Sequence, residues 1–212
     1  GIMQINSERI ITRFEEKPKD PAVLDELKLD PAWHEALGIQ TRDERFLASM
    51  GIYVFSRSVL QKLLNNSFSD FGKHIIPKAI DTYRVGSYIY QGYWEDIGTI
   101  RSFFEANLDL TEVLPRFNFF DMMAPIFSRP RFLPGTKING AQIELSVIAD
   151  GCIINSAKIH HSIVGVRSYV DSGTELHRVV SMGCAFYESS ESIAQKERAG
   201  IPRMGIGRNC RI

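Results

Sequence analysis

The chain has 212 residues, of which 44% are apolar and 24% are charged, and its 25 basic side chains balance 25 acidic ones. This composition is typical of a globular protein and excludes a disordered or fibrous chain. The neutral balance gives no reason to expect a nucleic-acid partner, and no apolar run is long enough to predict a membrane span. The three cysteines, Cys152, Cys184 and Cys210, have no zinc-motif spacing, so a reduced, cytoplasmic protein is expected.

The beginning of the chain predicts two strands, followed by surface loops. Apolar runs at 2–5 and 9–14 flank a polar turn and predict a hairpin. The stretch 18–46 is charged and contains three prolines, so it predicts surface loops with a short helix. The apolar run at 47–55 predicts a strand buried on both faces, and Ser56 is a candidate cap for the helix that follows.

Helices and strands continue to alternate after this point. Asp70 is a second candidate cap, and Pro77 is expected to distort or end the helix that it starts. A strand is predicted at 83–91, and Thr99 is expected to cap a helix that follows an aromatic turn. This alternation predicts an α/β domain that ends near residue 111.

The second half has a different organisation. Four prolines between 112 and 135 predict a linker, and apolar residues then recur every six positions in 136–212. The rows with this spacing are Ile148 and Ile154; Val147, Ile153 and Ile159; and Val164, Val170 and Leu176, after a shift of phase near His160. Small residues between them favour a hexapeptide β-helix over an open sheet of short strands. A polar excursion at 186–204 interrupts the pattern, which is unfinished at the last residue.

Three motifs of the first half, followed by this β-helix, resemble the sugar-phosphate nucleotidyltransferases. The motifs are 14–18 (FEEKP), 48–53 (ASMGIY) and 93–99 (YWEDIGT). Within that family, 130–134 (PRFLP) and 158–165 (KIHHSIVG) are similar to the cyanobacterial and plant glucose-1-phosphate adenylyltransferases. The resemblance implies the C-terminal part of a Rossmann-like α/β domain at 1–111, a linker at 112–135 and an incomplete left-handed β-helix at 136–212.

The resemblance also implies a reaction between glucose 1-phosphate and ATP, which yields ADP-glucose and pyrophosphate. Lys17 would pair with the sugar phosphate, and Asp96 would be one of the carboxylates that hold Mg²⁺. Residues expected to line the sugar pocket are Glu16, Ser49, Asp70, Phe71 and Trp94. Arg131 is the candidate contact of an anionic sugar-phosphate effector, although Arg129 stands where the plant pattern has glutamine. A homo- or hetero-tetramer is implied, in a plastid if the source is a plant.

Other interpretations remain open at this point. No glycine-rich phosphate loop occurs in the 212 residues, so we expect a fragment without the ATP-binding half and inactive by itself. A non-catalytic regulatory subunit and a nucleotidyltransferase of another base specificity are the alternatives. Hexapeptide acyltransferases use a histidine as general base, but His160 and His161 are better explained as residues of a β-helix corner.

Overall fold

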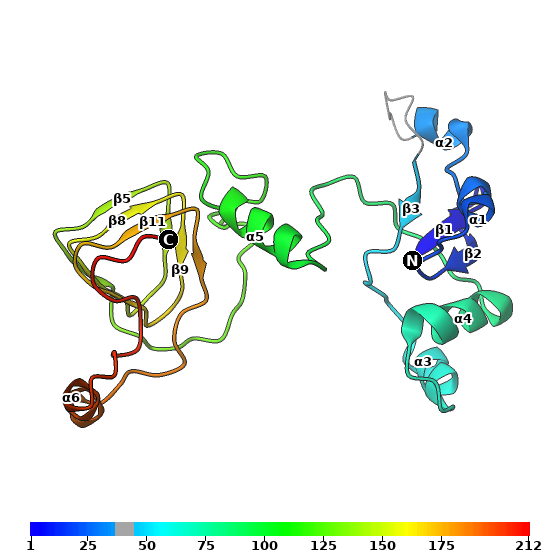
Figure 1. Ribbon diagram of the computed structural model, residues 1–212. Helices are drawn as coiled ribbons and strands as arrows, with labels where there is room; N and C mark the ends of the chain where they lie inside the picture. Colours follow the sequence, from blue (N-terminus) through cyan, green and yellow to red (C-terminus); the bar gives the residue numbers. More distant parts are fainter. Residues whose placement is uncertain (37–44) are drawn as a thin grey trace. The chain divides into compact units, whose positions relative to one another are not determined.

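The computed structural model describes residues 1–36 and 45–212, which form two compact units at Gly1–Gln91 and Gly92–Ile212 (Figure 1). The part of the predicted surface loop at 37–44 lies outside the described residues. Within the described ranges, no helix is long and apolar enough to cross a membrane. The contacts assign the residues after Gln91 to the second unit. The predicted domain limits at residues 111 and 136 stay predictions.

The first unit begins with the predicted hairpin, which the structure confirms. Strands β1 (Ile2–Ile5) and β2 (Ile11–Glu15) pair antiparallel, and β3 (Leu47–Ala48) pairs with the other edge of β1. The side chain of Asn6 holds the turn, because its Oδ1 accepts hydrogen bonds from the backbone N–H groups of Glu8 and Ile10, both at 3.0 Å.

Two predicted strands of the first unit are wrong. The apolar run 47–55 is a strand only at Leu47–Ala48, and Ile52 and Val54 are 75% and 97% exposed. The stretch 83–91 contributes a single bridge, between Ile10 and Gly86. An apolar run remains a strand only where a neighbouring strand supplies hydrogen-bond partners, and among the described residues β1 reaches no further than Ala48.

The helices of the first unit are short. They are α1 (Pro21–Glu26), α2 (Pro31–Ala36), α3 (Arg57–Leu64), the π-helical turn η1 (Phe71–Ile75) and α4 (Ile76–Thr82). Leu63, Ile75 and Ala79 are buried together and join α3, η1 and α4. Pro77 lies in the first turn of α4, directly after η1, and it does not end the helix, which continues to Thr82.

The second unit starts with a loop that leads into α5 (Ile100–Asp109). The predicted cap at Thr99 is confirmed: its hydroxyl accepts from the N–H of Ser102 at 3.0 Å, and the Ser102 hydroxyl accepts from the N–H of Thr99 at 3.1 Å. Residues 112–135 contain no helix or strand, as expected for a linker. Arg178 of the β-helix contacts α5, with its guanidinium 3.4 Å from a carboxylate oxygen of Glu105.

The rest of the second unit is a coil of three parallel sheets (Figure 1). One sheet contains β4 (Lys137–Asn139), β7 (Ile153–Asn155) and β10 (Tyr169–Val170). The second contains β5 (Gln142–Glu144), β8 (Lys158–His160) and β11 (Glu175–His177). The third contains β6 (Val147–Ile148), β9 (Ile163–Val164) and β12 (Val180–Ser181). The predicted β-helix is confirmed.

The core of the coil corrects one detail of the repeat. Ile154, Ile159, Val164, Val170 and Leu176 are all buried to 2% exposure or less, so successive inward positions lie five or six residues apart. Val147 and Ile153 therefore do not form an inward row with Ile159, because each directly precedes an inward residue. Left-handed corner residues such as Gly140, Ser156 and Gly173 stack in successive coils and set this variable step.

The predicted excursion is also confirmed. It contains α6 (Ser190–Arg198), which Ser189 caps, and no side chain of this helix is buried. The chain returns to the coil through bridges between Val170 and Ile206 and between Glu175 and Arg211. Residues 206–212 thus start a further coil, in agreement with the resumed spacing in the sequence.

Candidate active site

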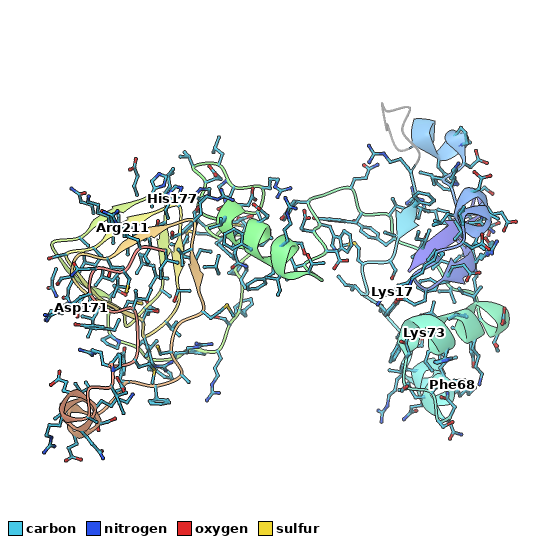
Figure 2. All side chains as sticks on the ribbon, in the orientation of Figure 1. Lys17, Phe68, Lys73, Asp171, His177 and Arg211 are labelled. Carbon is cyan, nitrogen blue, oxygen red and sulfur yellow. The ribbon has the colours of Figure 1, made fainter. Side chains whose placement is uncertain are left out.

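Lys17 and Glu16 directly follow β2, at the edge of the sheet in the first unit (Figure 2). The backbone of Lys17 has a φ of 49°, a left-handed conformation that turns the chain before Pro18. The side chain is exposed, and no described carboxylate pairs with it. An unpaired ammonium group at the end of a strand is suited to an anionic ligand.

The carboxylate of Glu16 lies against η1. A Cβ atom at position 72 would stand 2.5 Å from Oε2 of Glu16, so the absence of a side chain at Gly72 permits this approach. The side chain of Glu16 is only 19% exposed. The structure therefore brings Glu16 next to the segment that contains Asp70 and Phe71, as the predicted site requires.

Ser49 joins the same region through an aromatic side chain that the sequence analysis did not select. Its hydroxyl lies 3.1 Å from the hydroxyl of Tyr53, whose ring stacks on Phe71 with centroids 6.3 Å apart and planes inclined by 16°. Phe55 contacts both rings, at centroid distances of 6.2 Å. Gly51, at a φ of 72°, turns the chain between Ser49 and Tyr53, and a glycine inside an apolar run was the available signal for this bend.

Asp70 has a structural role that the sequence predicted. Its Oδ1 accepts a hydrogen bond from the backbone N–H of Lys73 at 2.8 Å and so caps η1. This hydrogen bond is the main cause that lowers the pKa of Asp70 below the ordinary aspartate value. Phe71, 39% exposed, is free on one side to contact a ligand. The role of both residues in sugar binding stays a prediction.

Trp94 and Asp96 belong to the second unit, in the loop before α5. The indole of Trp94 is 42% exposed, and Asp96 is exposed with its Oδ1 3.0 Å from the backbone N of Gly98. This hydrogen bond forms an Asx turn and does not involve the second carboxylate oxygen of Asp96, Oδ2. Among the described residues, no group of three or more His, Cys, Asp or Glu side chains could hold a metal ion. Asp96 can thus supply one ligand to a cation whose other ligands are phosphate oxygens and water, which is a usual arrangement for Mg²⁺.

The candidate effector contact and the two histidines lie elsewhere in the second unit. Arg131 is exposed in the linker that precedes β4. His161 occupies a left-handed corner, as predicted, with a φ of 47°, and its Nε2 is 3.3 Å from a carboxylate oxygen of Glu112. His160 instead lies in β8 and stacks on His177 of β11, with ring centroids 5.1 Å apart. The Nε2 atom of His161 is buried without a hydrogen-bond partner, whereas Nδ1 of His160 lies 3.1 Å from Nδ1 of His177.

Comparison with known proteins agrees with this organisation. Residues 1–113 match the family model described as nucleotidyl transferase, and residues 131–212 match the model described as GLGC left-handed parallel beta-helix domain. Over 221 aligned positions the chain is 42% identical to the glucose-1-phosphate adenylyltransferase small subunit, chloroplastic/amyloplastic, of Triticum aestivum. The alignment covers all of this chain and 46% of the wheat protein, so the chain spans about half the length of that relative. The chain belongs to the nucleotidyl transferase family, with a left-handed β-helix after its α/β region.

Proposed function

We propose that this chain forms the sugar-phosphate-binding region and the β-helix of a glucose-1-phosphate adenylyltransferase. The observation that carries the proposal is the cluster around η1, where Glu16 contacts Gly72 and Ser49 is linked to Phe71 through Tyr53. The identity to the wheat subunit along the whole chain supports the same reaction. The substrates would be glucose 1-phosphate and ATP.

In this reaction a phosphate oxygen of glucose 1-phosphate attacks the α-phosphorus of ATP. A new P–O bond forms, the bond between the α-phosphorus and the bridging oxygen breaks, and pyrophosphate leaves. Phosphoryl-group chemistry of this kind depends on positioning and on neutralisation of charge. The ammonium group of Lys17 would hold the sugar phosphate. Glu16 would accept hydrogen bonds from the sugar hydroxyls, and the Ser49 hydroxyl would form a further hydrogen bond with the sugar.

The remaining residues have supporting roles in the proposal. Phe71 and Trp94 would provide apolar walls for the sugar ring, and Asp70 would keep η1 in place next to Glu16. Asp96 would hold Mg²⁺ through the carboxylate oxygen that Gly98 does not use. When bound, the ion neutralises charge on the reacting phosphates.

Assembly and regulation follow from the same resemblance. The name of the wheat relative describes it as a small subunit, which supports an oligomeric enzyme, and we propose a homo- or hetero-tetramer. Arg131 would contact an anionic sugar-phosphate effector. A regulatory, non-catalytic subunit is the second candidate, and the name of the wheat relative, a small subunit, is compatible with it.

A chimera tests the proposal directly. The chain replaces the matching segment of the wheat subunit, and ADP-glucose formation is measured with glucose 1-phosphate and ATP, with other hexose 1-phosphates and nucleoside triphosphates as alternatives. We expect turnover by the chimera and none by residues 1–212 alone, because the chain by itself has no loop to cradle the triphosphate. Turnover by 1–212 alone would contradict that expectation, and an inactive but folded chimera would favour the regulatory subunit.

Two variants of the chimera separate binding from chemistry. Lys17→Ala removes a cation that contacts the substrate before and during reaction, so it should raise the KM for glucose 1-phosphate by about tenfold or more. Asp96→Asn removes a metal ligand whose effect grows as charge develops, so it should lower kcat by about tenfold or more. Lys19→Ala and Glu95→Gln are the neighbouring controls. An unchanged KM in the first variant, or an unchanged kcat at saturating Mg²⁺ in the second, shows that the residue has another role.

A further inference from the structure

Two histidines lie side by side on the second sheet of the β-helix. His160 belongs to β8 and His177 to β11, and the two residues are in register as neighbours in this parallel sheet (Figure 2). Residues in register on adjacent strands project from the same side of a sheet, and the inward positions here are occupied by Ile159 and Leu176. Both imidazoles therefore lie on the outer side of the coil. Neither histidine belongs to the candidate active site, so a role for the pair is independent of the proposed function.

The same nitrogen atoms of the two rings approach each other closely. Nδ1 of His160 lies 3.1 Å from Nδ1 of His177, and the ring planes are inclined by 13°. Two neutral imidazoles at this distance share one proton, because each ring has a proton on one nitrogen and a lone pair on the other. The separation also suits a metal ion. With metal–nitrogen bonds of about 2.0–2.1 Å and an angle of about 90–110° at the metal, two nitrogen ligands lie about 2.8–3.4 Å apart.

The histidine pair is accessible to an ion from solvent. His177 is exposed and His160 is half-buried, so the ion and the water molecules bound to it can reach the two rings. Among the described residues, no group of three or more His, Cys, Asp or Glu side chains could hold a metal ion. The pair would thus supply two ligands, and water would occupy the remaining coordination positions.

The charges on neighbouring positions do not oppose a cation. The basic side chains next to the pair are already bound to carboxylates, at distances of 3.3–3.4 Å. These ion pairs are Lys158 and Arg211 with Glu175, and Arg178 with Glu105. The exposed Glu144, which is in register with His160 one coil earlier, adds a further negative charge on this side of the sheet. Three acidic groups therefore balance three basic ones, and a divalent ion is not repelled.

We propose that His160 and His177 bind a divalent transition-metal ion of the Zn²⁺ class through their Nδ1 atoms. Imidazole nitrogen is a preferred ligand of Zn²⁺, Ni²⁺ and Cu²⁺, whereas Mg²⁺ prefers oxygen ligands. The bound ion takes the place of the shared proton. The ring with its proton on Nδ1 changes to the tautomer with the proton on Nε2, so no net proton is released. Because the two histidines belong to successive coils, the ion would join β8 to β11 and stabilise the β-helix.

Titration of the 1–212 chain with Zn²⁺ tests this inference by NMR. The ion is added at neutral pH in a buffer that does not bind metals, and the nitrogen-15 resonances of the imidazole rings are followed. We expect saturable shifts of the Nδ1 signals of both His160 and His177, with a Kd below roughly 0.1 mM. Mg²⁺ at the same concentration should leave these signals unchanged, because it binds oxygen ligands. Absence of saturation, or the same shifts with Mg²⁺, would overturn the proposal. This measurement uses the unmodified chain, so it does not depend on the folding of any variant.

Three variants identify the ligands. His160→Gln and His177→Gln should each weaken Zn²⁺ binding by about tenfold or more, because one ring nitrogen remains. His74→Gln, which removes an exposed histidine of η1, should bind Zn²⁺ as the unmodified chain does. Saturating Zn²⁺ should also raise the Tm of the β-helix in the unmodified chain and in His74→Gln, and in neither of the other variants, because an ion bound only to the folded state stabilises it. Unchanged affinity in His160→Gln or His177→Gln would place the ion elsewhere, for example at the free cysteines, and would reject the inference.

Discussion

Glycine at position 72 determines how closely Glu16 can approach η1. The carboxylate oxygen Oε2 of Glu16 occupies space that a methyl group at position 72 would need, with only 2.5 Å between the two. Ordinary van der Waals contact needs about 3.5 Å or more, so one of the two groups must move when a side chain is added. Gly72 is therefore a positioning residue for Glu16, separate from any residue that contacts substrate.

Replacement of this glycine tests that role. Gly72→Ala should displace the Glu16 carboxylate and raise the KM for glucose 1-phosphate in the chimera several-fold, with a smaller change in kcat. Gly86→Ala is the matched control, because a Cβ atom there meets no atom within 4 Å. Equal KM values for the two variants would mean that the contact between Glu16 and Gly72 has no part in substrate binding.

At the level of single elements, each strand from β7 to β11 buries one side chain inside the coil. In β8, Ile159 is 1% exposed inside the coil, whereas the Lys158 side chain is 68% exposed and pairs with Glu175. The apolar interior of the coil, which includes Ile154, Ile159, Val164, Val170 and Leu176, is the main stabilising contribution, since exposed ion pairs contribute at most about 1 kcal/mol.

Substitution of neighbouring residues in β8 measures this difference. Ile159→Ala should lower the free energy of unfolding of the β-helix by about 2–5 kcal/mol, because it leaves a cavity in a closely packed core. Lys158→Ala should change it by less than about 1 kcal/mol. Urea denaturation followed by far-ultraviolet circular dichroism compares the two variants. A similar loss in both would show that the coil interior is not the source of stability.

The excursion depends on an ionised carboxylate. The pKa of Glu188 is lowered chiefly by the hydrogen bond from Lys196, and next by the backbone N–H of Met204. A carboxylate whose pKa is lower in the folded state contributes stability above its unfolded value, and this contribution is lost as the pH falls through the folded value.

The expected pH dependence is therefore loss of protection on acidification. Amide hydrogen exchange in α6 and at Met204 should become faster, relative to the intrinsic rate, as the pH falls below the ordinary glutamate range. Glu188→Gln should exchange faster already at neutral pH and should lack this transition, while Glu191→Gln, in the exposed first turn of α6, should retain it. A transition that persists in Glu188→Gln belongs to another group.

At the scale of the whole molecule, the first coil of the β-helix has an uncovered end. Strand β4 lies at the edge of its sheet, and Ile138, whose counterparts Ile154 and Val170 are fully buried, is 49% exposed. Uncovered strand edges and apolar surface favour association with another surface. We therefore predict that residues 136–212 mediate self-association.

Light scattering of the 1–212 chain tests this prediction. We expect an oligomer, and Ile138→Lys should shift it toward the monomer, because a charge would have to be buried in the interface. Ile100→Lys is the control, since Ile100 is 90% exposed on α5. A monomer at high concentration, with the β-helix folded, would contradict the predicted role of residues 136–212.

Several elements could be predicted from the sequence because their causes are local or repeated. The hairpin depends on Asn6, which accepts bonds from residues two and four positions later, and α5 depends on the reciprocal cap of Thr99 and Ser102. The β-helix depends on apolar residues that recur in every coil, so it could be predicted although five-residue steps interrupt the six-residue repeat. Such patterns are readable because their partners are close in sequence or recur at nearly constant intervals.

The tertiary structure decided the features that depend on distant partners. The apolar run 47–55 is as suitable for a strand as β1, but a strand needs a neighbour along its whole length, and β1 ends beside Ala48. The links of Tyr53 to Phe71 and of Glu16 to Gly72 join segments that no local pattern connects. The pairing of Glu188 with Lys196 could not be predicted either, because the geometry of the fold determines which cation of the excursion Glu188 meets. The sequence by itself determined local turns, caps and the coil repeat, whereas contacts between distant segments determined which runs became strands and which charges were paired.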